Sequence, residues 1–149
     1  MASEARLRPE DCNCLAIRQA ARHVTQFYDQ CLASVGLRTT QFSILAKLKR
    51  LGPMTINALA KEMVMDRTTL GRNILPLERE GLIAIVQGQA DRRRKEVRLT
   101  EAGAVRFRAG VKGWVEAQQR FAAVFGGERT ADLRQLLRAV AASDFDTVR

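Results

Sequence analysis

The segment from Thr55 to Gly103 constrains the fold more than any other part of the chain, because it joins a helical pattern to two short strands. Two short helices are predicted first, one from Thr55 and one after Asp66, which is a favourable N-cap residue. The apolar run 82–86 and the alternating run 96–99 then predict two strands around a polar, basic turn. Helix, helix, strand, basic turn and strand in this order predict a winged helix-turn-helix, a module that reads double-stranded DNA.

Helical patterns flank this module on both sides. Asp11 is predicted to cap a first helix that stops at Gly36, after an irregular arm over 1–10. Thr100 is predicted to open the long helix that Gly126-Gly127 breaks. Apolar residues at three- and four-residue spacing place the remaining helices at about 11–35, 39–52, 101–125 and 130–142.

The predicted fold class is mainly α with a small β-wing, organised as one compact unit over 1–149. The winged helix-turn-helix occupies about 37–100, and the terminal helices occupy about 11–35 and 101–145. Those terminal segments are too narrow to form a core of their own, so their apolar stripes need a partner. A second copy of the chain is the simplest partner, and we expect the terminal helices to form a dimerisation region.

Charge and composition narrow the class of protein. The net charge of +9, from 25 basic and 16 acidic residues, favours a polyanionic partner such as DNA. A hydrophobic content of 46% excludes a disordered chain. No apolar run approaches the ~18 residues of a membrane span, and the first residues lack the apolar core of a signal peptide. We therefore expect a cytoplasmic protein without a membrane partner.

Three stretches of the module resemble one family. They are Leu77-Glu78-Arg79-Glu80-Gly81-Leu82-Ile83, Asp91-Arg92-Arg93 and Val97-Arg98-Leu99-Thr100-Glu101-Ala102-Gly103. In sequence and order they resemble the recognition helix, the wing and the following helix of the MarR family of bacterial transcription regulators. The resemblance implies a homodimer that binds palindromic operators, usually as a repressor, without a cofactor. It also implies release by a small aromatic effector or, in one branch, by cysteine oxidation.

The N-terminal half of the second short helix carries the candidate base-reading residues, since that part of a recognition helix faces base edges in the major groove. Arg contacts guanine, Asn contacts adenine, and a Thr methyl group contacts thymine. The alternative is an ordinary solvated face of a surface helix. Thr55 and Asn57, at the start of the preceding helix, are expected to hold phosphates or to cap. The candidate base-reading residues are Arg67, Thr68, Thr69, Arg72 and Asn73.

The wing and the recognition helix each carry a departure from the family pattern. In that pattern Asp91 and Arg93 fit a structural pair that holds the wing, and Arg92 lies at its tip. We expect Arg92 to enter a minor groove, with Arg94 and Lys95 as lesser phosphate contacts. The stretch Gly88-Gln89-Ala90 lacks a charge that many relatives carry, and Pro76 inside the recognition helix removes a backbone donor.

Two kinds of switch are open. Cys12 and Cys14 lie near a predicted helix start, where the helix dipole stabilises a thiolate, although Asp11 opposes it. Cys31 falls on the apolar stripe of the first helix and is expected to be a core residue. The alternative switch is an effector pocket between the dimer helices and the DNA-binding lobe. Its candidate lining residues are His23, which we expect on a buried helix face, and Phe27, Phe42 and Trp114.

Four functions compete at this point. The leading reading is a ligand-responsive homodimeric repressor, and the second is a redox regulator of the same fold that uses Cys12 or Cys14. A third is an architectural DNA-binding protein without an effector. An enzyme is opposed, because the chain has one histidine, no ligand-spaced Cys and His set for a metal, no nucleophile elbow and no Gly-rich phosphate loop.

Overall fold

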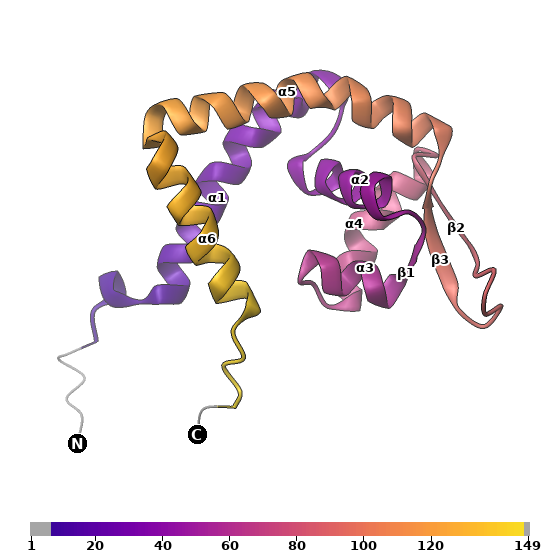
Figure 1. Ribbon diagram of the computed structural model, residues 1–149, viewed down its shortest axis with the longest axis horizontal. Coiled ribbons are helices and arrows are strands. Elements are labelled where there is room, and N and C mark those ends of the chain that lie inside the picture. Colours follow the sequence, from indigo (N-terminus) through magenta and orange to yellow (C-terminus); the bar gives the residue numbers. More distant parts are fainter. Residues whose placement is uncertain (1–6, 148–149) are drawn as a thin grey trace.

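The computed structural model describes residues 7–147, which form two helical arms and a winged lobe joined by one long helix (Figure 1). A short 3-10 turn, Pro9–Asp11, precedes the first helix. A second 3-10 turn, Ala33–Val35, follows the first helix. The helices and strands, in chain order, are α1 Asn13–Leu32, α2 Thr39–Leu51, β1 Met54–Thr55, α3 Ile56–Met63, α4 Arg67–Arg79, β2 Ile83–Gln87, β3 Lys95–Leu99, α5 Glu101–Phe125 and α6 Gly127–Ala142.

The winged lobe holds the hydrophobic core, because α2, α3 and α4 bury their apolar faces against one another and against the sheet. The sheet has the order β1-β3-β2 and is antiparallel, with Met54 opposite Val97 and Ile83 opposite Leu99. The fully buried side chains include Ile44 and Leu45 of α2, Leu59 of α3, Leu70 and Leu77 of α4, and Val97 of β3. This core fixes the orientation of α4 relative to the wing.

A tight joint connects the end of α4 to the start of α5. The Thr100 hydroxyl donates to the Gly81 carbonyl at 2.6 Å and accepts from the Gly103 amide at 3.0 Å. A Cβ at Gly103 would collide with the Leu82 carbonyl. One turn further along α5, Arg106 Nη1 donates to the Val35 carbonyl at 3.2 Å and lies 3.9 Å from Glu80 Oε1. The first part of α5 is therefore fastened to the lobe that carries α4.

The far half of α5 reaches away from the lobe and meets α1 and α6 (Figure 1). The backbones of α1 and α5 approach closely, since a Cβ at Gly113 would collide with the Cys31 carbonyl. The Tyr28 hydroxyl of α1 donates to Gln118 Oε1 of α5. No helix within 7–147 has both the length and the apolar character that a membrane crossing requires.

Most predicted elements are confirmed within one or two residues. The first helix ends at Leu32, before its predicted end near residue 35, because Ala33–Val35 form a 3-10 turn, and three further details are wrong. Asp11 does not cap α1: it lies in the 3-10 turn, and Cys12 is the N-cap, because its Sγ accepts from the Leu15 amide at 3.4 Å. Helix α6 begins at Gly127 rather than near residue 130. The two-residue strand β1 was not predicted. Of the predicted irregular arm, residues 1–6 lie outside the described range.

Candidate nucleic-acid interface

Helices α3 and α4 form a helix-turn-helix whose two starts are both capped by side chains. The Thr55 hydroxyl accepts from the Ala58 amide at 3.1 Å. Asp66 accepts from the Thr69 amide at 2.7 Å and from the Thr69 hydroxyl at 3.1 Å. These two hydrogen bonds, the backbone one first, hold the pKa of Asp66 below its usual value. Asp66 therefore caps α4 as a carboxylate and fixes where the recognition helix begins.

The exposed face of α4 carries most of the predicted base-reading residues. Leu70, Ile74 and Leu77 point into the core, which turns the opposite face of the helix to solvent. Four of the five predicted residues are exposed there, namely Arg67, Thr68, Thr69 and Arg72. Their contact with DNA stays a prediction.

Asn73 differs from the other four predicted residues. It is half-buried, and its side-chain amide donates to the Thr69 carbonyl at 2.8 Å. Reading an adenine would require the amide to leave this bond. The place of Asn73 on the helix could be predicted from the residue spacing, but its hydrogen bond to the Thr69 carbonyl could not.

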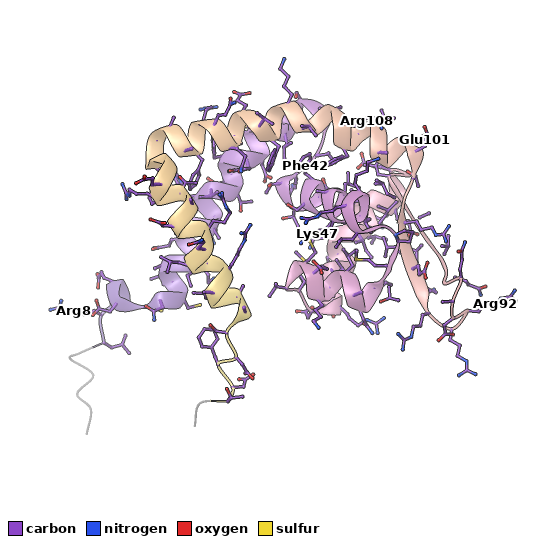
Figure 2. The ribbon with its side chains drawn as sticks, in the orientation of Figure 1. Arg8, Phe42, Lys47, Arg92, Glu101 and Arg108 are labelled. Atoms are coloured by element: carbon purple, nitrogen blue, oxygen red, sulfur yellow. The ribbon has the colours of Figure 1, made fainter. Side chains whose placement is uncertain are left out.

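The wing is the β2–β3 hairpin, closed by a loop whose backbone is hydrogen-bonded across its base. The Gly88 amide donates to the Arg94 carbonyl at 2.7 Å, and a Cβ at Gly88 would crowd the loop backbone. Figure 2 shows Arg92 at the outer end of the hairpin, pointing away from the lobe. Arg92 and Lys95 are exposed, so they remain available for a polyanion.

The predicted structural pair of the wing is only partly as expected. Asp91 Oδ1 accepts from the backbone amide of Arg93 at 3.0 Å. The guanidinium nearest to Asp91 belongs to Arg94, with Nε 3.8 Å from Oδ2. Asp91 thus contacts Arg93 through the backbone amide and Arg94 through the side chain, and the role of the Asp91–Arg93 pair in holding the wing stays a prediction. Arg93 is exposed and makes no ion pair within the described residues.

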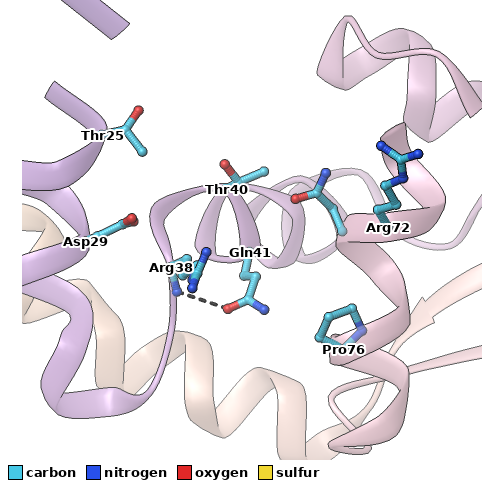
Figure 3. Close-up of a pocket in the computed structure, with 8 residues that line it drawn as sticks. Thr25, Asp29, Arg38, Thr40, Gln41, Arg72 and Pro76 are labelled. Atoms are coloured by element: carbon cyan, nitrogen blue, oxygen red, sulfur yellow. Dashed lines mark hydrogen bonds between the residues drawn. The ribbon is translucent and has the colours of Figure 1, made fainter. Parts of the chain in front are cut away.

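A cavity of about 420 Å³ lies between α1, α2 and the recognition helix α4 (Figure 3). Asp29 of α1 caps the start of α2, since Oδ1 accepts from the Thr39 amide at 2.7 Å. Arg38 and Arg72 bring two guanidinium groups to the same cavity. The full lining is Thr25, Asp29, Arg38, Thr40, Gln41, Arg72, Asn73 and Pro76. A ligand held here would touch Arg72, which we predict to read bases.

The four residues predicted to line an effector pocket do not line this cavity. Phe42 is buried and stacks on Phe107 and Trp114, with ring centroids 5.0 Å and 6.3 Å away. Phe27 is half-buried, with the Arg120 guanidinium 4.8 Å from its ring centroid. His23 is exposed, so its expected burial is wrong within the protomer. A role for these residues in effector binding stays a prediction.

A second cavity, of about 390 Å³, lies among α1, α5 and α6. Its apolar lining includes Val24, Phe121, Leu133 and Leu137. Burial raises the pKa of the Tyr28 hydroxyl at its wall. This cavity opens onto the apolar stripes of the terminal helices, which the protomer leaves exposed.

The three cysteines are free thiols in three different settings. Cys12 caps α1 and is exposed, Cys14 is exposed in the first turn, and Cys31 is half-buried against α5. Cys31 thus lies where a packing residue was predicted. Within residues 7–147 no group of three His, Cys, Asp or Glu side chains is placed to hold a metal ion.

Known proteins share this arrangement. The family model described as the MarR family matches residues 37–95. An uncharacterized HTH-type transcriptional regulator of Bacillus subtilis (strain 168), YwoH, is 34% identical over 85 residues, which span 57% of this chain. The matched segment covers 61% of that relative's length.

Solved structures match over nearly the whole chain. The M. tuberculosis transcriptional regulator MosR, in complex with DNA, is 35% identical, with a TM-score of 0.76 over 89% of this chain and 98% of that one. BpsR of Bordetella bronchiseptica, whose DNA binding is regulated by 6-hydroxynicotinic acid, shares the fold at 23% identity, with a TM-score of 0.79 over 93% and 99% of the two chains. With the winged lobe, the arms and these matches in place, the chain belongs to the MarR family.

Proposed function

We propose that this protein is a homodimeric transcriptional repressor that binds a palindromic operator and leaves it when a small aromatic effector binds. The proposal refines what family membership establishes, namely a DNA-binding transcription regulator that is not an enzyme. The observation that carries it is the exposed polar face of α4, with Thr68 and Arg72, next to a wing with Arg92 at its tip. A relative of 35% identity holds DNA with the same fold.

The exposed apolar side chains of the terminal helices support the proposed dimer. Ile17 of α1 is 43% exposed, and Leu136 and Leu137 of α6 are 66% and 45% exposed. Apolar stripes of this extent are typical of a surface that a partner covers. A second copy related by a two-fold axis would also present two recognition helices to the two halves of a palindrome.

The cavity beside Arg72 supports the choice of effector. Arg38 and Arg72 favour an anionic group such as a carboxylate. The Asp29 carboxylate also lies on the wall, where its Oδ1 accepts from the Thr39 amide, and the other lining residues are uncharged. An occupied cavity would engage Arg72 and hold α4 against α1. Half-sites one helical turn apart require the two recognition helices of the dimer to lie about 34 Å apart. A ligand that holds α4 against α1 would favour a different distance between the two helices, and so would compete with operator binding.

The proposal is tested with a duplex that the protein selects from a random library. Sedimentation at micromolar concentration should give about twice the 16.6 kDa mass of the chain. A panel of aromatic acids is then titrated into the free protein and into the protein–duplex complex. Release requires tighter binding to the free form, because a ligand shifts an equilibrium only by its difference in affinity. A monomer, or equal affinity for both forms across the panel, would overturn the corresponding part.

A thiol switch is the second candidate, favoured by the exposed Sγ of Cys12 at the N-cap of α1. Mild peroxide is applied to the wild type and to a Cys12→Ser/Cys14→Ser double variant, and binding to the selected duplex is measured. Loss of binding in the wild type alone supports the redox reading. Equal binding by both proteins eliminates it and leaves the small-molecule effector.

A further inference from the structure

Gly71 has no structural reason to be glycine. It lies in the second turn of α4, where glycine destabilises a helix relative to alanine. Its φ is not in the left-handed region, and an added Cβ would meet nothing within 4 Å.

The other glycines are explained by the folded chain, with one exception. Gly36, Gly52, Gly81 and Gly126 have a positive φ, which favours glycine. A Cβ at Gly88, Gly103, Gly110 or Gly113 would press on neighbouring atoms. Gly127, the first residue of α6, is the only other glycine with ordinary φ and open space. Gly71 is thus the one glycine inside a helix that the protein alone does not require.

The neighbours of Gly71 show what the open space faces. Thr68 precedes it by three residues and Leu75 follows it by four, so both lie beside it along one side of α4. Thr68 is exposed, and Leu75 is 46% exposed although it is apolar. Position 71 therefore leaves a gap in the row of side chains, flanked along the helix by Thr68 and Leu75, and we refer to this gap as the slot. Arg72 is the residue that follows Gly71 in the sequence.

We propose that this slot receives the C5-methyl group of a thymine in the operator, which makes Gly71 a specificity-determining residue. The proposal rests on the proposed function, because it assigns a base to the α4 face that is held to read DNA. The slot offers no side-chain donor or acceptor at its floor, so it does not suit a phosphate or a polar base edge. In the major groove thymine alone carries a methyl group, and apolar contact is how proteins read it.

The slot requires glycine because one methyl group fills it. An alanine Cβ at position 71 would occupy the space that the thymine methyl is held to take, and would push α4 away from the groove. The helix itself would gain from the same alanine. The proposal therefore makes an unusual pair of expectations: the substitution stabilises the free protein and weakens its complex.

The experiment adds one methyl group to the protein, by Gly71→Ala, and removes one from the DNA, by replacing a thymine with deoxyuridine. The duplex selected by the wild type is prepared with each thymine of a half-site replaced in turn by deoxyuridine, which lacks only the C5-methyl. At one position the wild type should bind the deoxyuridine duplex about fourfold more weakly, the value of one buried methyl group. Gly71→Ala should bind the thymine duplex about tenfold more weakly than the wild type, and should recover most of that loss on the deoxyuridine duplex.

Two controls separate this effect from damage to the protein. Gly71→Ala should melt about 2–4 °C above the wild type, as expected for a glycine replaced in an open helix. Gly127→Ala adds the same methyl group at the start of α6, away from α4, where the protomer leaves open space. It should bind both duplexes as the wild type does.

The outcomes distinguish a failure of the proposed Gly71–thymine contact from a failure of the proposed DNA-binding function. Wild-type affinity of Gly71→Ala for the thymine duplex overturns the inference alone. So does an equal loss on the thymine and deoxyuridine duplexes at every position, or a selected half-site without thymine. A wild-type protein that selects no duplex overturns the proposed function and the inference together.

Discussion

Arg72 and Arg92 are both exposed arginines, but they occupy different kinds of surface. Arg72 lies on α4, and Arg92 lies at the tip of the wing. Arg72→Ala should cost roughly 1–3 kcal/mol of binding free energy and blunt the discrimination between selected and scrambled duplexes. Arg92→Ala should weaken both duplexes evenly and flatten the salt dependence. Titrations at several salt concentrations measure both effects, and unchanged affinity in the two variants would remove the docking proposal.

Thr100 and Thr130 form a matched pair for the stability of the protomer. Thr100 joins Gly81 to the start of α5 through two hydrogen bonds, so Thr100→Val should lower the free energy of unfolding by about 1–2 kcal/mol. The Thr130 hydroxyl is buried without a hydrogen-bond partner within the described residues, so Thr130→Val should be neutral or slightly stabilising. Chemical denaturation of both variants measures the difference. Equal losses would contradict the role given to Thr100.

At this scale the sequence predicts which residues share a helix face, but not which local partner each side chain finds. Leu70, Ile74 and Leu77 follow one another at four- and three-residue steps, as expected for one face of a helix, and all three are buried in α4. Residue spacing does not predict that Asn73 donates to its own helix or that Arg94 approaches Asp91 more closely than the Arg93 side chain does. Such choices depend on rotamers and loop geometry within a few ångströms, which residue spacing does not determine.

Among the elements, α4 carries the clearest internal conflict, because Pro76 lies inside it and the helix still runs unbroken to Arg79. Proline removes the amide that would bond the Arg72 carbonyl. Pro76→Ala restores that donor and should raise the free energy of unfolding by about 1–3 kcal/mol. Differential scanning calorimetry measures the gain. A lower Tm would instead show that the ring at the cavity wall contributes more through packing than the lost hydrogen bond costs.

The elements of the winged lobe could be predicted from sequence because each begins and ends with a local signal. Thr55, Asp66 and Thr100 cap α3, α4 and α5 with their side chains, as such residues commonly do. The misses have equally local causes. Strand β1 has two residues and no periodicity, and it exists only because Met54 pairs with Val97 of β3. The Gly126-Gly127 pair predicts a longer break than occurs, since only Gly126 has a positive φ and Gly127 already continues as α6.

For the whole molecule, the architecture links the two ends of α5. Its start is fastened to the lobe that carries α4, through Thr100 and Arg106. Its far half packs on α1 and α6, whose apolar stripes the protomer leaves exposed. If two copies pack through these helices, a change in their packing would move each α5, and each α4 would move with the α5 to which its lobe is fastened. In the proposed dimer, the distance between the two recognition helices would then be set by how the two copies pack rather than by either lobe.

Separating the two copies should therefore abolish operator binding while leaving each lobe intact. Leu136→Glu places a charge on the exposed apolar stripe of α6, where the side chain is 66% exposed in the protomer. Because the protomer does not bury this residue, the lobe should fold normally, whereas a dimer interface would have to bury an unpaired carboxylate. The variant should sediment near 16.6 kDa and lose roughly 100-fold or more in affinity for the full palindrome, since the two half-sites no longer bind as one unit.

The matched control is Leu51→Glu, which introduces the same charge at a 49% exposed leucine at the end of α2 in the winged lobe. It should remain dimeric by sedimentation. A duplex with one half-site distinguishes loss of the dimer from damage to the lobe. Leu136→Glu should bind this duplex with the affinity of one intact lobe for one half-site. If Leu136→Glu still sediments as a dimer, α6 is not at the interface, and the partner must be sought along α1 and the far half of α5, where Ile17 and Val115 are exposed in the protomer.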